Sequence, residues 1–106
     1  MSNVRRVDFQ MREGSDRGCV YETDDIQIMR IRLAANEVLP HHNSNANVLL
    51  VPLEGRIQLA TEAGNEVVGV GESLSVPYDS PMDVSNAGND TAVFLVLKTP
   101  HPKTFK

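Results

Sequence analysis

Three histidines carry the clearest potential for chemistry in this sequence. His41 and His42 are adjacent, and His101 lies between two prolines near the end of the chain. A neutral imidazole binds transition metals and transfers protons near pH 7, so each is a candidate metal ligand or acid–base group. Adjacent residues of a strand point to opposite faces, so only one of His41 and His42 can enter a pocket built from strands. A three-histidine metal centre would need all three.

The composition excludes several classes of function. A chain of 106 residues makes one domain, and a formal charge of −4 argues against nucleic-acid binding. No signal peptide or long apolar stretch is visible, so we expect no membrane association. The single cysteine, Cys19, allows no internal disulfide, which suits a reducing compartment, and we expect a cytoplasmic protein. Cys19 has no flanking His or Asn motif and is interpreted as a small buried residue.

The elements that must position these side chains are strands. Asp25–Leu33 alternates apolar and polar residues with a period of two, which is typical of a half-buried strand. Further strands are predicted at Val48–Leu53, Arg56–Ala60, Glu66–Val70, Ser73–Pro77, Met82–Asn86 and Thr91–Lys98. Short strands at this spacing, with turn residues between them, indicate an all-β sandwich or closed barrel.

The chain divides into three parts. Residues 1–24 form an N-terminal arm, in which Val4–Gln10 and Cys19–Tyr21 are candidate edge strands. Residues 25–98 form the barrel. Residues 99–106 form a tail whose prolines lack the N–H donor that regular pairing needs.

The segment from Gly71 to Asn86 resembles the second sequence motif of the cupins, a family of small β-barrels. That motif has a Gly, a strand ending in Pro, a Gly two residues later, then a His and an Asn. Here Gly71, Pro77 and Asn86 match, while Asp79 replaces the second Gly and Met82 replaces the His. The resemblance implies an all-β, single-domain double-stranded β-helix, or jelly-roll barrel.

The first cupin motif has two His residues separated by one residue, then a Glu, then six residues and a Gly. Gly55 matches the closing Gly, which puts Val48 at the Glu position. His42 then takes the first His position and Ser44 the second. A spacing longer by one residue selects His41 and Asn43 instead, and the sequence leaves both spacings open.

Cupin metal sites commonly combine three His and one Glu, which suits divalent transition metals. Along this chain, the resemblance places Val48, Ser44 and Met82 at three of those four positions, so the usual site is degenerate. No cofactor is therefore assigned. A divalent transition metal would need a rearranged site made of His42 with His41 or His101.

The retained barrel and the depleted ligand set predict a protein that binds an unknown small molecule inside the barrel. The expected pocket residues are His42, Ser44, Val48, Leu50, Met82 and Asn86. The sequence identifies no reaction and no catalytic residue. The alternatives are a metal-dependent isomerase or dioxygenase with the rearranged site, and a non-catalytic structural or dimerisation module.

Two predicted strands are apolar on both faces, at Val48–Leu53 and Val93–Leu97. A single small barrel leaves one face of each strand in water, whereas strands buried on both sides give such runs. We therefore expect a homodimer in which the outer sheet faces pack together.

Overall fold

The computed structural model describes residues 3–10 and 16–105, and most of them lie in strands. The strands are β1 Arg17–Glu22, β2 Gln27–Leu33, β3 His42–Asn43, β4 Val48–Glu54, β5 Arg56–Thr61, β6 Gly64–Gly69, β7 Leu74–Val76, β8 Pro81–Asn86 and β9 Ala92–Lys98. A short 3₁₀ helix, η1, spans Pro102–Phe105. No helix in the described ranges has the length and apolarity needed to span a membrane.

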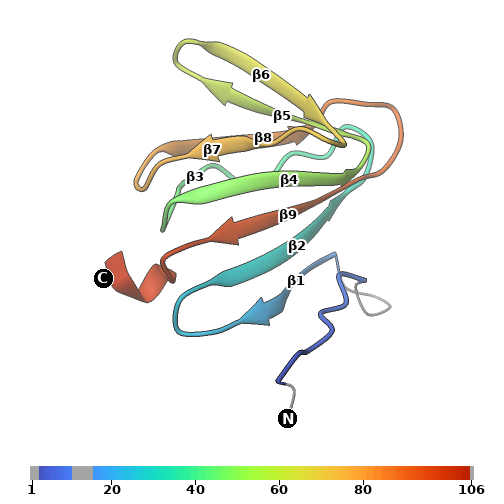
Figure 1. The fold of residues 1–106 in the computed structure, drawn as a ribbon. Helices are drawn as coiled ribbons and strands as arrows, with labels where there is room; N and C mark the ends of the chain where they lie inside the picture. Colours follow the sequence, from blue (N-terminus) through green and yellow to red (C-terminus); the bar gives the residue numbers. More distant parts are fainter. Residues whose placement is uncertain (1–2, 11–15, 106) are drawn as a thin grey trace.

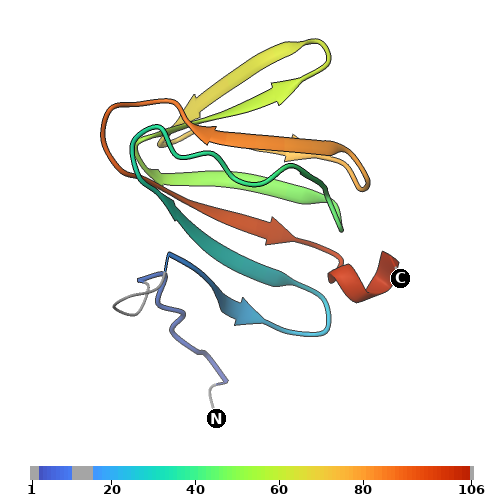
Figure 2. The same cartoon turned by 180° about the vertical axis from the view of Figure 1, so that it is seen from behind.

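The strands form two antiparallel sheets that face each other (Figures 1 and 2). The larger sheet has the order β1-β2-β9-β4-β7, and the smaller one has the order β3-β8-β5-β6. Apart from the β1–β2 and β5–β6 hairpins, neighbouring strands are not consecutive in the sequence, and the chain passes repeatedly from one sheet to the other, as in a jelly roll. The predicted all-β architecture is confirmed.

The N-terminal arm contributes one strand to the larger sheet. Residues 3–10 form no strand, whereas β1 pairs antiparallel with β2 and forms the edge of the sheet. Cys19 lies on β1 and is exposed, so its interpretation as a buried residue is wrong. Because β1 is an edge strand, its side chains are flanked by a neighbouring strand on one side only.

The turn from β4 to β5 depends on Gly55. Its φ is +70°, in the left-handed region that glycine adopts without steric cost. A Cβ added there would lie 2.8 Å from the carbonyl oxygen of Thr91, so the β8–β9 connection also approaches too closely for a side chain. This turn aligns β4 with β9 in the larger sheet and β5 with β8 in the smaller one.

The core lies between the sheets and is made of the inward positions of both. Its largest fully buried side chains are Phe94, Leu33, Leu50, Ile57 and Val84. Because side chains alternate along a strand, Phe94, Val96 and Lys98 all project from the same face of β9. A cationic residue therefore ends an otherwise apolar inner row.

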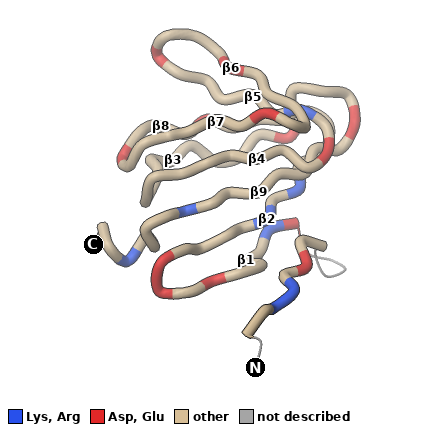
Figure 3. Tube along the Cα trace, in the orientation of Figure 1, with Lys and Arg blue, Asp and Glu red and all other residues tan. Residues whose placement is uncertain are grey.

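The C-terminal turn is held by contacts at both of its ends. His101 Nε2 lies 2.5 Å from Glu22 Oε2, and Lys103 Nζ lies 2.7 Å from Asp24 Oδ1. Figure 3 shows the basic position of this turn beside the acidic β1–β2 turn. On the other side, the rings of Tyr78 and Phe105 stack with their centroids 4.4 Å apart.

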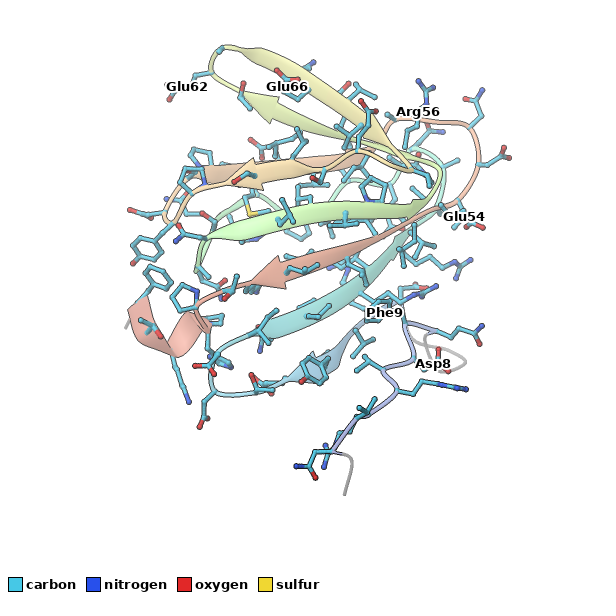
Figure 4. The ribbon with its side chains drawn as sticks, viewed as in Figure 1. Asp8, Phe9, Glu54, Arg56, Glu62 and Glu66 are labelled. Atoms are coloured by element: carbon cyan, nitrogen blue, oxygen red, sulfur yellow. The ribbon has the colours of Figure 1, made fainter. Side chains whose placement is uncertain are left out.

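Two acidic side chains of the β5–β6 hairpin are exposed to solvent. Glu62 and Glu66 lie on the β5–β6 hairpin and extend away from the sheets (Figure 4). Both residues are exposed, as expected for charged residues beside a turn. They contribute nothing to the interior between the sheets.

Candidate functional site

A cavity of about 130 Å³ lies between the two sheets. Most of its wall is apolar, formed by Met29, Ile31, Leu39, Val48, Met82, Val84, Phe94 and Val96. Four polar residues complete the wall, namely Arg17, His42, Asn45 and Lys98. A largely apolar cavity with a few polar groups on its wall is the usual form of a small-molecule site.

His42 faces the cavity from β3. It pairs with Met82 of β8 across the smaller sheet, and both residues line the cavity. Its Nδ1 lies 3.1 Å from the carbonyl oxygen of Pro40, which can only accept, so Nδ1 carries the proton of the neutral ring. Nε2 then keeps a lone pair that can accept a hydrogen bond. Of the two spacings that the sequence leaves open, the one that selects His42 names a residue of the cavity wall.

His41 points the other way, as adjacent strand residues must. Its side chain is 63% exposed, and its Nδ1 lies 2.6 Å from Asp83 Oδ1. The imidazole therefore forms a surface contact with β8 and takes no part in the cavity wall.

His101 is engaged through both ring nitrogens. Nδ1 accepts the backbone N–H of Lys103 at 3.1 Å, so Nε2 carries the hydrogen that Glu22 accepts. The contact with His101, followed by a hydrogen bond from Gln27, lowers the pKa of the Glu22 carboxyl. With no free lone pair in this arrangement, His101 is not placed to share a metal with His42.

The three histidines thus occupy three separate environments, contrary to a shared site of His41, His42 and His101. In residues 3–10 and 16–105, no group of three or more His, Cys, Asp or Glu side chains is arranged to hold a metal ion.

Three of the six expected pocket residues lie outside the cavity wall. Ser44 is buried, where its Oγ donates to the carbonyl oxygen of Pro77 at 2.6 Å and accepts the N–H of Ser80 at 2.9 Å. Leu50 is fully buried core. His42, Val48 and Met82 are the expected pocket residues that the structure brings together.

Asn86 is the third residue outside the cavity wall. Its side-chain amide joins two separate turns through hydrogen bonds. Its Nδ2 donates to the carbonyl oxygens of Leu33, Ala34 and Asp90 at 2.7 to 3.1 Å. Its Oδ1 accepts the N–H of Gly88 at 2.8 Å. These partners engage both the Nδ2 and the Oδ1 of the amide, so Asn86 stabilises the fold and does not line the cavity.

Asp79 shows that the turn of the second motif persists without its glycine. Its φ is +60°, which Asp tolerates better than most residues because its short side chain bonds locally. The Asp79 Oδ1 accepts a hydrogen bond from Asn43 Nδ2 at 3.0 Å. The position therefore keeps the backbone geometry that the motif's glycine usually provides.

Sequence reasoning missed the cationic side of the cavity. Arg17 belongs to the N-terminal arm, and no local pattern predicts that β1 pairs with β2. Lys98 could have been found, because it shares its strand parity with Phe94 and Val96.

Of the two cations, Lys98 has the positive charge that is less well balanced by nearby negative charge. It is half-buried, and burial lowers the pKa of its ammonium below the usual 10.5, while the nearby Cys19, when ionised, raises it. By contrast, the Arg17 guanidinium has a carboxylate partner, Glu37, at 3.6 Å.

No protein-family model matches the chain. An uncharacterised protein of Methanocaldococcus jannaschii, MJ0764, is 34% identical over 82 residues, which cover 76% of this chain and 71% of that protein. The crystal structure of MJ0764, an RmlC-like cupin with a double-stranded β-helix fold, matches with a TM-score of 0.80 at 25% identity. That match covers 98% of this chain and 97% of the other.

A cupin superfamily protein from Desulfitobacterium hafniense matches with a TM-score of 0.71 at 15% identity, covering 87% of this chain and 84% of the other. At that identity the likeness shows the fold alone. The identity to MJ0764 adds a relationship in sequence. The chain therefore belongs to the cupin family and has its double-stranded β-helix fold, as the two motifs predict.

Proposed function

We propose that this cupin binds a small organic molecule in the cavity between its sheets. The observation that carries the proposal is the open space of about 130 Å³ between the two sheets, whose wall is mostly apolar. An apolar cavity of roughly 150 Å³ is known to hold a benzene molecule. The ligand is therefore the size of one small ring or a short branched chain.

The donor set at the motif positions does not fit the metal that many cupins hold. His42 offers one imidazole nitrogen, Met82 offers a thioether, and Val48 offers no donor. The Ser44 hydroxyl is already bonded to Pro77 and Ser80. A divalent metal in a protein needs several N, O or thiolate ligands around one point, so we propose binding that does not depend on a metal.

Titration with benzamide, a neutral molecule with a benzene-sized body, tests the proposal. We expect saturable shifts in the amide NMR signals of Val48, Met82 and Val96, all of which line the cavity. The variant Val48→Phe fills the space and abolishes the shifts. Val67→Phe is the matched control, because it adds the same ring on β6 where the native side chain is 43% exposed.

Folding of both variants is checked by their thermal midpoints. If benzamide, 3-methylbutanamide and the two corresponding acids, benzoate and 3-methylbutanoate, all leave the wild-type spectrum unchanged, the proposal is refuted. Shifts that persist in a folded Val48→Phe variant would place binding outside the cavity and refute it as well.

For assembly, we propose a homodimer through the outer face of β4. Leu49 is 36% exposed and Leu53 is 40% exposed, with Val51 half-buried between them on the same face. A stripe of large apolar side chains on a sheet surface favours pairing with a second identical stripe.

Light scattering coupled to gel filtration tests this arrangement. We expect the mass of a dimer for the wild type and of a monomer for Leu53→Arg. Val70→Arg serves as the control, since Val70 is 66% exposed and lies outside β4. A monomeric wild type at every concentration measured would exclude the dimer.

A further inference from the structure

The charged residues on the cavity wall have one sign. Arg17 and Lys98 are cationic, and His42 adds an imidazole, while the wall contains no Asp or Glu among the residues that the structure describes. Most of the remaining wall is apolar. A wall of this kind favours a ligand that combines an apolar body with an anionic group.

The two cations differ in whether they have an anionic partner within the protein. The Arg17 guanidinium has a carboxylate partner in Glu37 at 3.6 Å. The Lys98 ammonium has no hydrogen bond or ion pair to any residue in ranges 3–10 and 16–105. A half-buried charge without a partner is unfavourable, and an opposite charge that reaches it is correspondingly attracted.

The geometry of β9 separates the apolar and the charged parts of the wall. Phe94, Val96 and Lys98 follow one another on one face, and successive residues on a face are about 7 Å apart. That spacing matches a small ring, or a branched chain of a few carbons, followed by one anionic group. Across the cavity, His42 keeps a lone pair at Nε2 and can share a proton with a second polar atom of the ligand.

Resting on the small-molecule binding proposed above, we infer that the ligand is a small monocarboxylate with a compact apolar body. Its carboxylate pairs with the Lys98 ammonium, and its apolar body packs against Phe94 and Val96. Lys98 is thus the residue that selects an acid over its neutral analogue.

The pKa of Lys98 agrees with this arrangement. Burial lowers that pKa in the free protein, and a carboxylate beside the ammonium would raise it again by favouring the charged form. A bound anion therefore offsets part of the free-energy cost of burying the charged Lys98 ammonium. Neither Arg17, which is already paired, nor His42 offers the same gain.

Two isosteric pairs test the assignment, benzoate against benzamide and 3-methylbutanoate against its amide. Each titration is followed by NMR at pH 7 and constant ionic strength. We expect the wild type to bind at least one acid about tenfold more tightly than its amide, as a hydrogen-bonded charge pair would give. Lys98→Met keeps the apolar stem and removes the charge, so it should bind both members of that pair with similar affinity.

Two controls separate Lys98 from charge in general. Lys103→Met removes a lysine whose partner is Asp24, outside the cavity, and should leave the preference intact. Arg17→Gln should reduce the preference less than Lys98→Met, because Glu37 already neutralises the guanidinium.

The results distinguish a failure of the carboxylate assignment from a failure of small-molecule binding itself. If amides and acids bind equally well, or Lys98→Met keeps the full preference for the acid, the carboxylate assignment is wrong while binding in the cavity stands. If no member of either pair binds the wild type, both the assignment and the proposed function are refuted.

Discussion

The turn positions and the cavity positions of the two cupin motifs behave in opposite ways. At the turns, Ser44 and Asn86 have every side-chain polar group bonded within the protein. At the cavity, the motif residue His42 keeps a free ring nitrogen, and Lys98, which lies outside both motifs on the facing sheet, has an ammonium without a partner in the described residues. Polar groups at the turns stabilise the fold, whereas those at the cavity are left available to a ligand.

The largest effect on stability is expected from Asn86→Ala. The substitution removes the donors for the carbonyl oxygens of Leu33, Ala34 and Asp90, two of them in partly buried contacts. We expect the free energy of unfolding to fall by about 3 kcal/mol, measured by urea denaturation. Asn89→Ala, at an exposed turn position, should change it by less than about 0.5 kcal/mol. A similar small change for Asn86→Ala would remove the distinction between turn and cavity positions.

A smaller effect of opposite sign is expected from Lys98→Met in the ligand-free protein. Replacing a half-buried, unpartnered ammonium by an apolar side chain should raise the free energy of unfolding by up to about 1 kcal/mol. Urea denaturation at pH 7 measures it, with Lys103→Met as the exposed control. A clear loss of stability in Lys98→Met would mean that the ammonium has a stabilising partner within the protein.

The smallest effect concerns the surface contact between Glu22 and His101. The pKa of Glu22 is lowered from its usual 4.5, so its ionised form adds stability above that pH, and the gain is lost as pH falls through the lowered pKa. Glu22→Gln should therefore reduce the thermal midpoint by only about 1–2 °C at pH 7 and by less at pH 3. Glu62→Gln, on the exposed hairpin, should match the wild type at both pH values, and an equal deficit of Glu22→Gln at both would exclude this linkage.

Much of the fold could be predicted because turns are encoded locally. Gly55 has the positive φ that its motif position implies, and Asp79 adopts φ +60° in place of a glycine. Strand parity likewise predicted the alternation of β2. These features depend on residues close together in the sequence, where sterics and side-chain alternation act.

The cavity was harder to predict because its wall combines strands from distant parts of the chain. The choice between His41 and His42 depended on one residue of spacing, and the pairing of β3 with β8 decided it. The place of Arg17 on the cavity wall follows from the pairing of β1 with β2, which no local pattern predicts. Ser44 had the right motif position, but its hydroxyl bonds to a loop 33 residues away.

The contacts of the C-terminal turn have a consequence for the order of folding. Both the Glu22–His101 and the Asp24–Lys103 contact join residues 79 positions apart in the sequence. Closing such a long loop costs chain entropy that exposed contacts cannot offset, so these contacts form only after β2 and β9 have paired. Weakening the turn should then accelerate unfolding and leave the folding rate unchanged.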